Sequence, residues 1–257
     1  MHYYWISKNK AIGKNQLFDA MKKTFQGDSR KWLEFFNEIE QSSKTFENIF
    51  SNYSYDSFIS NYPKAVSNPK YSEKYIRYLK CFSFIKNKSW ILPIFTLLDY
   101  ETKVNRLGQT YIGKNKLHEI FRKHFIFSFL HFNVFSLPTR DFTPAMLKLS
   151  KGINLAFENN PNDPDKANSE INKCFLEHYT GKDSYVKKTI KLFRKMDFEF
   201  NEGIFKLRHA DDNKYLIHNI FGEIESIIFN GTFHNIAKTS VEHYMPQESE
   251  PSWDIPK

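Results

Sequence analysis

Turn-forming residues and cysteine are scarce in this sequence. Its 257 residues include only 9 Gly, 10 Pro and 2 Cys. So few glycines and prolines argue against a sandwich or barrel, which needs many tight turns. Cys81 and Cys174 belong to no CxxC motif or Cys/His cluster, so we expect neither a disulfide framework nor a zinc knuckle. The default setting for such a chain is the reducing cytoplasm.

Long apolar runs are also absent. The two most apolar stretches, 89–98 and 125–137, are shorter than the roughly 20 residues that a membrane-spanning helix needs. The second stretch also contains His131 and Asn133. We therefore predict that both are buried helices and that the protein has no membrane partner. A Walker loop, a Rossmann fingerprint and a nucleophile elbow are missing as well.

Aromatic residues and positive charge are abundant. The chain holds 26 Phe and 14 Tyr, and its net charge is +8. Residues 1–150 contain 23 Lys and Arg against 12 Asp and Glu, whereas residues 151–257 contain 14 against 17. A basic first half is compatible with phosphate contacts, so we expect any nucleic-acid binding to come from residues 1–150 and to weaken with salt. The alternative is that lysine only solvates a chain rich in phenylalanine.

Apolar residues recur at helical spacing from Leu17 to Ile228, which predicts a mainly α fold with about eight to ten helices. Loops are expected at 61–70 and 135–144, with Thr143 and Pro144 beginning the helix after the second loop. The clearest helical stretches are 15–25, 30–50, 72–85, 113–132, 165–179, 183–196 and 211–229. After this multi-helix body, residues 236–247 are predicted to run extended, because Asn230 and Gly231 break the last helix.

Histidines on the helices give no metal-binding pattern. His118, His124 and His131 are spaced by six and seven residues, whereas a helical metal pair needs residues i and i+4. Core packing or a polar contact is the better interpretation of these three. The cluster of His209, Asp211 and Asp212 precedes a predicted helix, where Asp is ordinary capping.

The stretch TSVEHYMPQ at 239–247 carries the candidate chemistry. In ββα-metal nucleases, a strand ends in an acidic or His residue that binds a divalent metal. The His that follows deprotonates the water that attacks phosphorus. Glu242 and His243, with Pro246 shortly after them, have this arrangement. Alone, the string EHxxP is short enough to occur by chance.

The surrounding sequence resembles the C-terminal domain of GmrSD-type restriction proteins. Residues 215–247 are similar to the approach to the HNH-like nuclease motif of that family, which typically reads Ile-Glu-His-Ile-hydrophobic-Pro-Gln. Residues 125–157 and 3–25 are also similar to parts of such proteins. The resemblance implies a modification-dependent DNA endonuclease, with DNA as partner and Mg or Mn as cofactor. It assigns metal binding to Glu242 and general-base catalysis to His243.

This sequence departs from the family pattern at two places. The DGQQR motif of the family's N-terminal domain is absent. The family's nuclease continues past Trp253 into a Gly-Asn-Leu strand and a metal-binding helix, whereas this sequence ends at Lys257. We therefore expect an incomplete ββα-metal motif that is inactive alone, with a separate chain supplying the missing parts.

By this resemblance, residues 1–110 correspond to the end of the N-terminal domain and a linker. Residues 111–235 correspond to the helical body of the C-terminal domain, and 236–257 to the nuclease motif. Two alternatives remain open: a non-catalytic helical module that binds DNA or another protein, and an unrelated helical protein. If the tail has no nuclease role, Glu242 and His243 are surface residues of a frayed terminus. A helix that contains Glu242 and His243 would favour the unrelated protein.

Overall fold

The structure is a computed structural model of the whole chain, and it divides into two units, Met1–Asn201 and Glu202–Lys257. The residues that it describes all lie in the first unit: 2–9, 12–50, 76–82, 85, 87–106, 117–193 and 195. The predicted helix at 211–229, the extended segment at 236–247 and the nuclease motif at 236–257 therefore lie outside the described residues. The three boundaries drawn from the family resemblance stay predictions.

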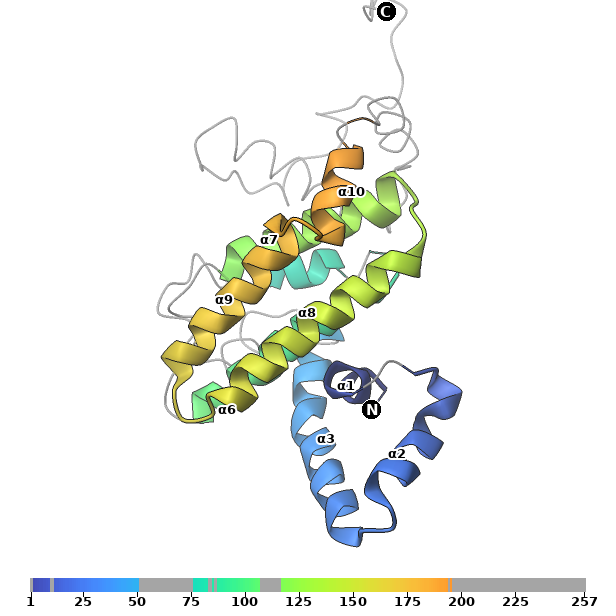
Figure 1. Cartoon of the computed structure of the whole chain (residues 1–257), viewed down its shortest axis with the longest axis vertical. Helices are drawn as coiled ribbons and strands as arrows, with labels where there is room; N and C mark the ends of the chain where they lie inside the picture. Colours follow the sequence, from blue (N-terminus) through green and yellow to red (C-terminus); the bar gives the residue numbers. More distant parts are fainter. Residues whose placement is uncertain are drawn as a thin grey trace, which may run out of the picture. The chain divides into compact units, whose positions relative to one another are not determined.

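The described part of the chain is mainly α, as the apolar spacing predicted, and it contains no strand. Its elements are shown in Figure 1. They are α1 (His2–Lys8), η1 (Lys14–Gln16), α2 (Leu17–Phe25), α3 (Ser29–Phe50), α6 (Ile91–Arg106), α7 (Leu117–Phe129), η4 (Leu130–Val134), α8 (Thr139–Asn159), α9 (Pro164–Thr180) and α10 (Tyr185–Phe193). Residues 76–82 are also helical. None of the helices described is long and apolar enough to span a bilayer.

Helix α8 is the centre of this unit, because it packs against α9, α6, α1 and α10. Figure 1 shows α8 lying between α6 and α9. The contact with α9 is close: a Cβ added to Gly152 would lie 2.9 Å from Cys174 Sγ. Glycine is the residue that permits this approach, although glycine lowers helix stability by about 1 kcal/mol relative to alanine.

Aromatic rings fill the core between these helices. Phe82 stacks on Trp90 with 4.5 Å between ring centroids, and Phe127 stacks on Phe142 at 5.7 Å. Trp90, Phe82 and Phe142 are completely buried. Rings of this size bury 150 to 250 Å² each (roughly), so the abundant phenylalanine is largely explained by core packing.

Helices α2 and α3 form a hairpin whose turn depends on left-handed backbone. Gln26 and Gly27 have φ of 47° and 78°, which reverses the chain after α2. Asp28 then accepts hydrogen bonds from the backbone N–H groups of Arg30 and Lys31 and so caps α3. One side of the hairpin stays apolar and open to solvent.

Three residues on that side of the hairpin are among the most exposed apolar residues described. Phe18 is 66% exposed, Leu33 62% and Phe36 48%. Trp32 joins them, with its ring centroid 6.4 Å from that of Phe18 and 5.8 Å from that of Phe36. We call these four residues the α2–α3 apolar patch. Patches of this kind often mark interaction sites.

The predicted start of α8 was wrong. The helix begins at Thr139, after an extended Pro138, and Pro144 lies inside it. An internal proline removes one backbone hydrogen bond, but Phe142 is fully buried, and its packing against Phe127 and Phe132 holds the first turn in place. Tertiary packing thus outweighs the local helix-start signal at Thr143 and Pro144.

Candidate functional site

Glu242 and His243, the residues assigned to metal binding and base catalysis from the sequence, lie outside the described residues. Within the described residues, no group of three or more His, Cys, Asp or Glu side chains is placed to hold a metal ion. The polar features that the structure does describe are a set of buried histidines, a network of ion pairs and a lysine-rich helix.

His124 is a core residue of α7. Its Nε2 lies 2.9 Å from the carbonyl oxygen of Trp90, so this nitrogen carries the proton and donates. The hydroxyl of Tyr179 lies 3.4 Å from Nδ1 and donates to it. Burial lowers the pKa of His124 to about 4, despite the opposing effect of the Trp90 carbonyl. The ring is therefore neutral at physiological pH and serves packing rather than acid–base chemistry.

His178 on α9 lies close enough to His124 for the two rings to influence each other electrostatically. Burial, with smaller contributions from His124 and Lys148, lowers the pKa of His178 to about 3. Neighbouring imidazoles in a dry setting cannot both be protonated without a large penalty. This pair makes the interface between α7 and α9 sensitive to acid.

His131 belongs to η4, a π-helical segment at the end of α7. Its Nε2 lies 2.6 Å from the hydroxyl of Tyr185, the first residue of α10. The ring also packs on Phe142, with 4.8 Å between centroids. Burial lowers the pKa of His131 to about 4. The wide π turn thus presents a neutral imidazole that anchors the start of α10.

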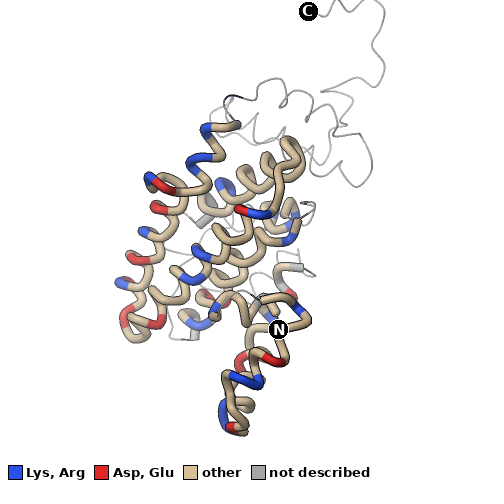
Figure 2. Tube along the Cα trace, turned by 45° about the vertical axis from the view of Figure 1, so that its right-hand side comes forward, with Lys and Arg blue, Asp and Glu red and all other residues tan. Residues whose placement is uncertain are grey.

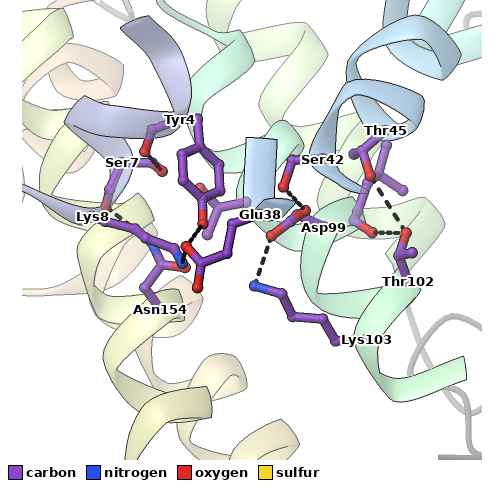
Figure 3. A network of polar contacts seen from close by, with 12 residues as sticks. Tyr4, Ser7, Lys8, Glu38, Ser42, Thr45, Asp99, Thr102, Lys103 and Asn154 are labelled. Carbon is purple, nitrogen blue, oxygen red and sulfur yellow. Dashed lines mark hydrogen bonds and ion pairs between the residues drawn. The ribbon is translucent and has the colours of Figure 1, made fainter. Parts of the chain in front are cut away.

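A network of polar side chains joins α1, α3 and α6 (Figure 3). At one end, Glu38 of α3 accepts hydrogen bonds from the Tyr4 hydroxyl and from Lys8 Nζ, the latter at 3.2 Å. Burial opposes ionisation of Glu38, but the Tyr4 hydrogen bond and the Lys8 charge outweigh it, so the pKa of Glu38 is lowered. Burial and the bond to Glu38 raise the pKa of Tyr4.

The other end of the network centres on Asp99 of α6. Its carboxylate accepts a hydrogen bond from Ser42 Oγ at 2.6 Å and pairs with Lys103 Nζ at 2.9 Å. Figure 3 shows Asp99 between these two partners. A cavity of about 20 Å³ lies beside Asp99 and Glu38, which is room for about one water molecule. Each carboxylate has both a cation and a hydroxyl as partners, so the network stabilises helix packing.

Helix α10 concentrates positive charge. Residues 182–195 include Lys182, Lys187, Lys188, Lys191 and Lys195 among those described. Asp183 is the acidic residue among those described in this range, and its carboxylate lies 3.9 Å from Lys188 Nζ. Figure 2 shows Lys and Arg gathered on α10, whereas on neighbouring α9 they alternate with Asp and Glu. The charge count over residues 151–257, with 14 Lys and Arg against 17 Asp and Glu, gave no sign of this concentration.

The lysines of α10 occupy the side opposite its buried residues. Val186 and Thr189 are buried against the body, and α10 contacts both α9 and α8. At 100° per residue, Lys187, Lys188 and Lys191 fall within an arc of about 100°. We call these three residues the α10 lysine face. Its cations lie in a row on a helix whose first residue, Tyr185, is hydrogen-bonded to His131.

Comparison of the chain with protein-family models, with curated proteins and with solved structures gives no match. The nuclease assignment therefore stands on the motif at 239–247 and its sequence context alone.

Proposed function

We propose that this chain takes part in metal-dependent hydrolysis of DNA phosphodiester bonds, as a fragment of a GmrSD-like, modification-dependent endonuclease. The observation that carries the proposal is the sequence Ser-Val-Glu242-His243-Tyr-Met-Pro246-Gln247. It combines an acidic residue, an adjacent base and a loop-shaping proline, in the order that HNH-like nucleases use.

In this proposal His243 removes a proton from the water that attacks phosphorus, and the leaving oxygen departs from the opposite side. Glu242 holds a divalent cation, which stabilises the negative charge that develops on the phosphate. A carboxylate oxygen suits Mg²⁺ or Mn²⁺. One carboxylate with one imidazole is too small a set to fix a catalytic metal, so the proposal includes further ligands from a second chain.

In this proposal the helical unit 1–201 contributes to DNA binding. Two features support a binding role. On the α10 lysine face, Lys187 and Lys191 have no ion pair among the described residues, and the pair of Lys188 with Asp183 is long, at 3.9 Å. The helix is also anchored by a partly buried side-chain hydrogen bond between Tyr185 and His131, so its cations are carried on a rigid element. Rigid elements position binding groups better than loops do.

The test uses the chain expressed with its neighbouring reading frames intact, so that any partner chain is present. The purified material is assayed for Mn²⁺-dependent cleavage of modified and unmodified plasmid DNA. We expect cleavage that is lost in His243→Ala and Glu242→Ala but retained in His234→Ala, a matched histidine control from the same region. Absence of cleavage, or cleavage that survives His243→Ala, would refute the proposal.

A second candidate is a non-catalytic helical module that binds a protein. The α2–α3 apolar patch favours it, because Phe18, Leu33 and Phe36 are open to solvent and contiguous exposed apolar groups often mark protein interfaces. The same His243→Ala variant separates the candidates. A protein-binding module still binds its partner when His243 is replaced by alanine, whereas a nuclease loses DNA cleavage.

A further inference from the structure

We infer that the α10 lysine face, formed by Lys187, Lys188 and Lys191, is the surface through which this protein contacts the phosphate backbone of DNA. The inference rests on the proposed function, because it takes DNA as the partner. It adds the location of the contact, which the motif at 239–247 does not give. It also departs from the expectation, drawn from the charge count, that DNA binding comes from residues 1–150.

The charge of the α10 lysine face is largely uncompensated. On α3, by contrast, two exposed cations have acidic neighbours: Arg30 Nε lies 3.8 Å from Glu34 Oε1. Lys31 Nζ lies 3.9 Å from Asp28 Oδ2. On α10, Lys187 and Lys191 have no ion pair among the described residues. The Lys188 pair is long and solvent-exposed, and exposed pairs of this kind contribute little.

The spacing of the three lysines fits a phosphate backbone. Lys187 and Lys191 are one helical turn apart, about 6 Å along the axis, so both can reach neighbouring phosphates of one strand. Lys188 lies beside them on the same side of the helix. Because phosphates repel one another and attract condensed counterions, three cations in a row displace those counterions on binding, and this release drives association.

The chemistry of α10 favours nucleic acid over an anionic membrane. A helix that lies on a membrane inserts an apolar side into the lipid. The inward side of α10 is already used, since Val186 and Thr189 are buried in the body. Among the side chains of α10 that the structure describes, Leu192 is the large apolar one exposed to solvent, at 44%, and one leucine is too little for insertion. The helix therefore fits a polyanion that needs charge contacts only.

The experiment measures binding of the full chain to a fluorescein-labelled DNA duplex by anisotropy, in EDTA so that cleavage does not interfere. The test variant is Lys187→Gln/Lys188→Gln/Lys191→Gln. Glutamine keeps helix propensity while it removes charge, and thermal melts check that the variant folds.

Two control variants accompany the test variant. Lys22→Gln/Lys23→Gln/Lys44→Gln removes the same charge from other exposed lysines, on α2 and α3. Arginine at the three α10 positions keeps the charge there.

We expect the α10 glutamine variant to weaken binding at least about tenfold at low salt. The slope of log K against log salt should fall in magnitude by about 2.7, which is 0.9 for each of three lost contacts. The α2–α3 control should change the slope by less than about 1, and the arginine variant should bind like the wild type.

Several results would overturn the inference. The control variant could weaken binding as much as the α10 variant does. Wild-type binding could ignore salt, or the chain could bind phosphatidylserine vesicles and not DNA. Failure here leaves the cleavage test of His243 untouched, because a nuclease that holds DNA by another surface still cuts it. If the chain binds DNA through α10 but shows no cleavage in the His243 test, the nuclease proposal is wrong and the inferred DNA-contact surface remains.

Discussion

Replacing Gly152 by alanine tests whether α8 and α9 are packed as closely as the structure shows. The added Cβ would meet Cys174 Sγ at 2.9 Å and Cys174 Cβ at 3.5 Å. The first distance is a clash, and the second is an ordinary van der Waals contact. The sulfur atom is therefore the specific obstacle, which makes the cost of Gly152→Ala dependent on one neighbour.

Two effects of opposite sign set the magnitude. Overpacking a tight contact costs about 1–3 kcal/mol, whereas alanine in place of glycine inside a helix stabilises it by about 1 kcal/mol. The net result for Gly152→Ala is a loss of up to about 2 kcal/mol. In a Cys174→Ala background the sulfur is gone, so the same substitution should stabilise the protein by up to about 1 kcal/mol.

The assay is thermal unfolding followed by circular dichroism, for the wild type, both single variants and the double variant. For a chain of this size a change of 1 kcal/mol moves the melting temperature by about 2–4 °C. We expect a coupling free energy of about 1–3 kcal/mol between the two sites. If Gly152→Ala has the same effect with and without the Cys174 sulfur, the close packing of α8 on α9 is wrong.

Three further predictions concern the buried polar groups. The pKa of His124 is about 4 in the folded chain against about 6.5 unfolded, so the unfolded chain binds more protons between these values. Stability should be full above pH 6.5 (roughly) and fall as the pH drops toward 4; melting temperatures that stay flat over this range would contradict it. Asp99→Ala removes the acceptor of the buried Ser42 hydroxyl and should cost about 1–3 kcal/mol in urea unfolding, with a smaller loss for Asp99→Asn. Tyr185→Phe removes the hydrogen bond to His131 and should cost about 1 kcal/mol, whereas an unchanged unfolding midpoint would argue against that anchor.

Helices with strong apolar periodicity were predictable from the sequence. The stretch predicted at 30–50 is helix Ser29–Phe50, and 183–196 contains Tyr185–Phe193. In both, one side of the helix is apolar, and local spacing is enough to show it. The π-helical segment η4 was not predictable, because it depends on where His131 and Phe132 pack rather than on a local pattern.

Contacts between residues far apart in the sequence could not be predicted either. Ser42 and Asp99 are 57 positions apart, and nothing in either local sequence signals the other. The same difference between local and long-range information applies to the candidate site. The tail motif was recognised from adjacent residues, and its assignment to Glu242 and His243 stays a prediction. The α10 lysine face needed the structure, because residues 151–257 hold 14 Lys and Arg against 17 Asp and Glu, and this total hides a local group of lysines.

Helix α1 completes its packing only after α8 has been synthesised. Its residues Tyr4, Trp5 and Ile6 are almost fully buried. Trp5 packs on Phe25 and Phe35, but α1 also packs on α6 and α8, which come from much farther along the chain. Asn154 Nδ2 donates to the Ser7 carbonyl at a separation of 147 residues. A ribosome adds about 5–20 residues per second, so α1 waits about 7–30 seconds for the segment that completes its packing. During that interval its aromatic residues are available to chaperones, and substitutions in α8 that slow docking should lengthen the exposure.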